Sequence, residues 1–61
     1  MPVVHVYMWA GRTPEVKEKI IKGITEVFVN LGVPAEAVTV ILHDIEKSNW
    51  GIAGKPASKT S

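Results

Sequence analysis

The chain has 61 residues, seven basic and six acidic side chains, a formal net charge of +1, and no cysteine. The balanced charge excludes the clustered basic face of a nucleic-acid-binding protein, and the lack of cysteine excludes disulfides and thiol catalysis. No apolar run approaches the roughly 20 residues of a membrane span, and the N-terminus lacks the pattern of a signal peptide. We therefore expect a cytoplasmic protein that binds neither nucleic acid nor a membrane.

The length predicts one small domain, residues 1–61, that depends on further copies of itself. A chain of this size buries only about 60% of its unfolded surface, and proteins this small usually add disulfides, a metal or oligomerisation. Two histidines are too few for a structural zinc site, and 46% of the residues are apolar. We expect a homo-oligomer without a metal, with a small polar tail at residues 57–61 that frays.

In chain order, residues 3–9 are rich in β-branched and aromatic side chains, which predicts a strand with both faces covered. Thr13, Pro14 and Glu15 form a helix start, with a capping hydroxyl, a proline at the first helical position and an acid near the positive helix end. Gly32 and Pro34 predict the end of that helix. Its apolar stripe consists of Val16, Ile20, Ile21, Ile24, Val27, Phe28 and Leu31.

Residues 38–45 predict a second strand, and residues 48–56, with two glycines around a short apolar piece, predict a small hairpin or an arm that reaches a neighbour. A strand, a helix and a strand make a single βαβ unit of the α/β class, with parallel strands. Because two strands alone do not form a stable sheet, the fold again requires another subunit.

Three residues are candidates for chemistry. Pro2 is either a harmless strand start or, if Met1 is removed, a secondary amine that can act as a base. Arg12 stands in the turn before the helix, where it is either solvated or a planar fork for a carboxylate. Trp50 is either an oligomer contact or a pocket wall. His43 and Asp44 should lie on opposite faces of a strand, so they do not predict a metal site.

Four features together resemble the 4-oxalocrotonate tautomerase family over essentially the whole chain. They are the Met-Pro start, the Gly11-Arg12-Thr13 turn before an amphipathic helix, the Val-x-Val-Ile strand and the Trp50-Gly-Ile-x-Gly-Lys arm. The resemblance implies a tautomerase-type fold in which two βαβ subunits form a four-stranded sheet per dimer. It further implies assembly into hexamers as trimers of dimers, and a mature chain that begins at proline and uses no cofactor.

The resemblance also implies roles for the candidate residues. Pro2 matches the amino-terminal proline that moves a proton between the oxygen and carbon of an enol. Arg12 matches an arginine that binds a substrate carboxylate or polarises the carbonyl, often from a neighbouring subunit. Trp50 matches an aromatic position that walls the pocket. Burial against Trp50 and the charge of Arg12 would both lower the pKa of the Pro2 amine, which suits a general base.

One position departs from the family pattern. Thr39 stands where the best-known members carry a second arginine, and a hydroxyl cannot hold a carboxylate by charge. The substrate is therefore either a monocarboxylate or a dicarboxylate whose second group is held by another cation, such as Lys47 or Lys55. Thr39 is kept as a candidate substrate-binding residue.

These observations predict an isomerase, an enol–keto tautomerase of 2-hydroxymuconate-like or other small 2-oxo acid substrates, as in the catabolism of aromatic compounds. Two uses of the same amine remain as alternatives: an iminium-forming nucleophile, and a protonated Pro2 that acts as the acid in a hydratase or dehalogenase. A non-catalytic oligomeric βαβ module is the alternative outside enzymes.

Overall fold

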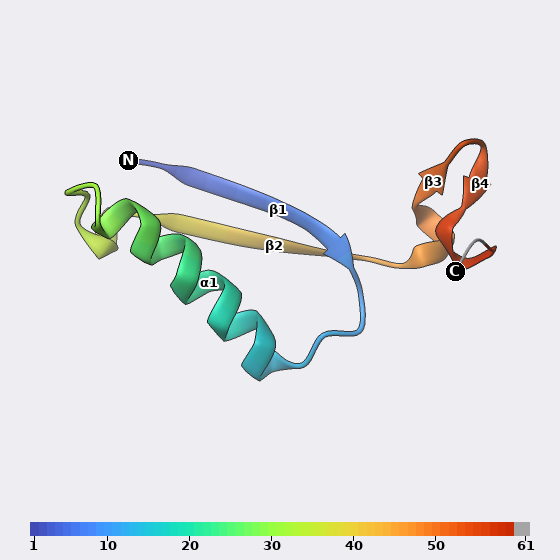
Figure 1. Ribbon diagram of the computed structural model, residues 1–61, viewed down its shortest axis with the longest axis horizontal. Coiled ribbons are helices and arrows are strands. Elements are labelled where there is room, and N and C mark those ends of the chain that lie inside the picture. Colours follow the sequence, from blue (N-terminus) through green and yellow to red (C-terminus); the bar gives the residue numbers. More distant parts are fainter. Residues whose placement is uncertain (60–61) are drawn as a thin grey trace.

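The computed structural model describes residues 1–59 (Figure 1). The elements in chain order are β1 (Val3–Trp9), α1 (Pro14–Val29), the short 3-10 helix η1 (Ala35–Ala37), β2 (Thr39–Ile45), η2 (Lys47–Asn49), β3 (Gly51–Ile52), β4 (Lys55–Pro56) and η3 (Ala57–Lys59). The predicted βαβ unit with a C-terminal hairpin is confirmed.

The two long strands form a parallel pair, as predicted, with a register that runs from Val3 opposite Thr39 to Trp9 opposite Ile45. Residues Val4, Val6, Met8, Val40 and Leu42 alternate onto one face and are half-buried there. Helix α1 lies along this face, and it is tied to it by an ion pair between Lys17 and Asp44. The two-stranded sheet is therefore covered on one side.

Helix α1 begins as predicted, because the Thr13 hydroxyl accepts a hydrogen bond from the backbone N–H of Val16 at 3.3 Å and Pro14 occupies the first turn. It ends at Val29 with Asn30 as the cap, two residues before the predicted last apolar position. The chain turns away at Gly32, whose φ of +96° is the left-handed conformation that glycine adopts without cost. Leu31 therefore lies outside the helix and is 75% exposed.

The second face of the sheet is not covered by any described part of the chain. Tyr7 stacks on His43 with ring centroids 4.4 Å apart, and His5 Nδ1 lies 2.9 Å from His43 Nε2. Val3 and Ile41 stand beside them, with half and two-fifths of their surface exposed. We call Val3, His5, Tyr7, Ile41 and His43 the open face. The prediction that both faces of the first strand are covered is not met within one chain.

A small hairpin lies beyond the C-terminal ends of β1 and β2, at the end of the molecule opposite to the N-terminus (Figure 1). Strands β3 and β4 are joined by Ala53 and Gly54, both with positive φ, which is the backbone of a tight two-residue hairpin turn. Residues 57–59, the first part of the tail that is expected to fray, form η3, and the N–H of Ala57 donates to the carbonyl of Trp50 at 2.7 Å. The last two residues of the predicted tail, 60–61, lie outside the described residues.

Very little of the described chain is fully buried. Among residues 1–59 the one buried apolar residue is Ala57, and the apolar stripe of α1 is wider than the sheet it covers, with Val27 58% exposed. Within the same residues, no helix has the length and apolar character that crossing a membrane requires.

Candidate active site

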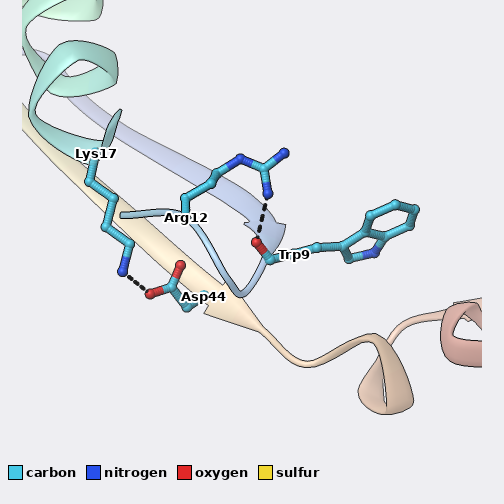
Figure 2. A network of polar contacts seen from close by, with 4 residues as sticks. All are labelled: Trp9, Arg12, Lys17 and Asp44. Carbon is cyan, nitrogen blue, oxygen red and sulfur yellow. Dashed lines mark hydrogen bonds and ion pairs between the residues drawn. The ribbon is translucent and has the colours of Figure 1, made fainter. Parts of the chain in front are cut away.

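The turn between β1 and α1 holds Arg12 against the end of the first strand. Gly11 has a φ of +119°, a conformation strained for any residue with a Cβ, and it turns the chain back beneath Trp9. The guanidinium Nη1 of Arg12 donates to the backbone carbonyl of Trp9 at 2.9 Å (Figure 2). Arg12 therefore has a fixed place at the C-terminal end of β1, while most of its donors remain free for a ligand.

The side chain of Trp9 lies at the centre of a second set of contacts. Its ring meets Trp50 edge to face, at 6.0 Å between ring centroids and 78° between planes. The ammonium of Lys47 lies 4.7 Å from the centroid of the Trp9 ring, a cation–π contact. The indole Nε1 of Trp9 is buried without a hydrogen-bond partner among the described residues. We call Trp9, Arg12, Lys47 and Trp50 the Trp9 cluster.

Pro2 and Thr39 lie together at the other end of the sheet. The backbone N–H of Thr39 donates to the carbonyl of Pro2 at 3.0 Å, and Pro2 is half-buried. A strand rises about 3.3 Å per residue, so the seven residues of β1 separate Pro2 from Arg12 by roughly 20 Å or more. The nitrogen of Pro2 is acylated by Met1 in the full sequence, and in that form it is an amide without basicity.

The predicted site residues thus fall into two groups within one chain. Arg12 and Trp50 are brought together through Trp9, and Pro2 and Thr39 form the second group. Neither Trp50 nor Arg12 can act on Pro2 of the same chain over this separation, so the expected lowering of its pKa cannot arise there. The described residues of a single chain also enclose no pocket. Any site that uses both groups takes them from different copies.

His43 and Asp44, near the C-terminal end of β2, lie on opposite faces of the sheet, as the alternation of a strand predicts. Asp44 points to the helix side and pairs with Lys17 (Figure 2), whereas His43 points to the open face and stacks on Tyr7. Residues 1–59 contain no group of three side chains that could hold a metal.

Sequence reasoning missed the part played by Trp9 and did not choose between the two candidate lysines. The alternation of β1 identified Trp9 only as an apolar residue of a strand. The contact between its ring and Lys47 depends on how the chain folds back at η2, which the strand pattern does not show. The sequence shows that Trp9 stands three residues before Arg12, but it does not show that the two residues are hydrogen-bonded. The bond from Arg12 to the carbonyl of Trp9 depends on the positive φ of Gly11, which only the backbone geometry reveals.

Comparison with known proteins places this arrangement in a family. The model of the family described as "Tautomerase enzyme" matches residues 2–60. A 2-hydroxymuconate tautomerase from Comamonas testosteroni is 42% identical over 60 residues, which are 97% of this chain and 95% of that protein. A structure from the 4-oxalocrotonate tautomerase isozymes of Methylibium petroleiphilum aligns with a TM-score of 0.86 at 40% identity, over 93% of this chain and 94% of that one.

A third similar structure is a fused 4-OT described as an asymmetric trimer. It aligns with a TM-score of 0.82 at 39% identity, over 90% of this chain and 46% of that longer chain. The sequence match covers nearly the whole chain, and the observed strand, helix, strand and hairpin are the fold of these neighbours. The chain belongs to the tautomerase enzyme family and is an isomerase of the 4-oxalocrotonate tautomerase fold.

Proposed function

We propose that the protein is a cofactor-free tautomerase that interconverts the enol and keto forms of 2-hydroxymuconate or a closely similar 2-oxo acid, with Pro2 as the general base once Met1 is removed. The observation that carries this proposal is the 42% identity to a 2-hydroxymuconate tautomerase over residues that include the candidate site. We further propose that it acts in the cytoplasm in the breakdown of aromatic compounds.

The proposed reaction moves one proton and needs no oxidant. The Pro2 amine takes the proton of the enol hydroxyl, and the electron pair of that O–H bond forms the carbonyl. The electron pair of the carbon–carbon double bond is displaced to a carbon of the substrate, and that carbon takes the proton back from the prolinium. Arg12 stabilises the negative charge that develops on the oxygen or holds a carboxylate. A positioned base of this kind contributes typically about 10²–10⁴-fold to the rate.

The proposal includes assembly, because each chain carries its two groups at opposite ends. A second copy that runs in the opposite direction brings its Trp9 cluster towards Pro2 of the first. Among residues 1–59, strands β1 and β2 each have one edge that no other strand pairs with, and an edge strand is a template for another chain. We propose a four-stranded sheet in each dimer and a hexamer built as a trimer of dimers, which also covers the open face.

The first test combines the mass of the purified protein with its activity. We expect a mass that lacks Met1, and ketonisation of 2-hydroxymuconate measured by the loss of ultraviolet absorbance of the dienol. A matched sample with one additional residue retained before Pro2 should bind substrate but lose catalysis, because its Pro2 nitrogen is an amide. A processed protein that ketonises neither 2-hydroxymuconate nor phenylenolpyruvate refutes the proposal.

Two results would favour the alternative uses of the amine. Reduction with borohydride in the presence of an aldehyde would trap an iminium on Pro2, and halide release from a haloacrylate would reveal a protonated Pro2 acting as an acid. A chain that assembles and shows none of these activities would be a non-catalytic module.

A further inference from the structure

We propose that Lys47 is a specificity-determining residue that binds the second carboxylate of the substrate, so that the site selects dicarboxylates over monocarboxylates of the same length. This inference rests on the proposed function for the identity of the substrate. It concerns a residue to which the tautomerase chemistry itself assigns no role.

The first observation is that one residue positions two cations. The backbone carbonyl of Trp9 accepts a hydrogen bond from Arg12 at 2.9 Å, and the ring of the same residue lies 4.7 Å below the ammonium of Lys47. Trp50 packs against that ring from the side. Both positive groups are therefore held by Trp9, Arg12 through the backbone carbonyl and Lys47 through the ring.

The second observation is that neither cation has an acidic partner. In the described part of the chain the one ion pair joins Lys17 to Asp44, so that carboxylate is already engaged by the helix. The contacts of Arg12 and Lys47 are with an uncharged carbonyl and an uncharged ring. Two cations without an acidic partner can each accept one carboxylate of an anion that carries two.

The third observation separates Lys47 from the other candidate. Lys55 lies in β4 of the hairpin and is exposed, and among the described residues no hydrogen bond, ion pair or cation–π contact joins its side chain to the Trp9 cluster. Thr39, at the Pro2 end, is uncharged. Lys47 is also half-buried, and an ammonium that is partly shielded from water binds a carboxylate more strongly than an exposed one.

The experiment compares two ligands that differ by one carboxylate. Muconate and sorbate are both six-carbon dienes, but muconate has a carboxylate at each end and sorbate has one. Neither carries the hydroxyl that tautomerises, so binding can be measured without turnover. Tryptophan fluorescence reports the binding directly, because Trp9 and Trp50 form the wall of the cluster.

The variants are Lys47→Gln and Lys47→Arg, the second of which preserves the charge and serves as the rescue. The matched control is Lys55→Gln, which removes an equal charge from the neighbouring strand β4. We expect Lys47→Gln to raise the Kd for muconate about tenfold, the effect of losing one charge-assisted hydrogen bond, and to leave the Kd for sorbate unchanged. Lys47→Arg should restore the affinity for muconate. Lys55→Gln should bind both ligands like the parent protein.

Equal losses for both ligands, or no loss for muconate, would overturn the inference, and a selective loss in Lys55→Gln would assign the role to Lys55 instead. These outcomes are separate from those of the proposed function. A protein that ketonises 2-hydroxymuconate but shows no effect of Lys47→Gln refutes this inference alone. An inactive protein whose affinity for muconate depends on Lys47 refutes the proposed reaction alone.

Discussion

If every site takes Pro2 from one copy and Arg12 from another, two inactive variants should restore activity when they are mixed. The perturbation is a Pro2→Ala chain and an Arg12→Ala chain, each purified, unfolded together and refolded at equal concentrations. The structure sets the expectation, because roughly 20 Å or more along β1 separates the two residues within a chain. A restored site needs the intact Pro2 of one variant beside the intact Arg12 of the other.

With random mixing, half of the sites receive an intact Pro2 and, independently, half receive an intact Arg12. About one quarter of the sites should therefore be complete. The assay is ketonisation of 2-hydroxymuconate at saturating substrate, from which the residual activities of the two variants refolded alone are subtracted. The control is a chain that carries both substitutions, which should not restore activity in either single variant. A mixed sample that assembles, as light scattering shows, but gains no activity would refute the separation of the two groups between copies.

Two further outcomes follow from the conformation and contacts of the single chain. Ala53→Asn should raise the free energy of unfolding by about 0.5 kcal/mol in urea titrations, because Ala53 has a φ of 53° and asparagine tolerates this conformation better; no gain would mean that the turn adapts freely. Asp44→Asn should cost only about 0.5 kcal/mol, since its ion pair with Lys17 is about one-third exposed; a loss several times larger would contradict a surface pair.

The elements were predictable because each has a local cause. Thr13 and Pro14 specify the start of α1 through a capping hydroxyl and a fixed φ, and these act whatever surrounds them. The β-branched run from Val3 predicted a strand, and the order strand, helix, strand predicted that the second strand is parallel to the first. The end of α1 was less predictable, because Leu31 continues the apolar period although its side chain is 75% exposed in the described structure.

The candidate site was predictable in its residues but not in its arrangement. Arg12 and Trp50 were recognised from residue type and position in a family pattern, which carries no distances. Their connection through Trp9 depends on a positive φ at Gly11 and on the fold of η2 after β2, neither of which leaves a periodic signal. The division of the site between the two ends follows only once β1 is known to be straight and unbroken from Val3 to Trp9.

Under the proposed assembly, the separation of Pro2 from Arg12 by the length of β1 also makes the activity depend on protein concentration. A single chain that has not assembled would lack an Arg12 beside its Pro2 and would have no activity. The specific activity should then fall when the protein is diluted below the concentration at which it assembles. Near that concentration, a modest increase in the amount of protein would raise the activity more than in proportion, because it would also raise the fraction of chains that are assembled.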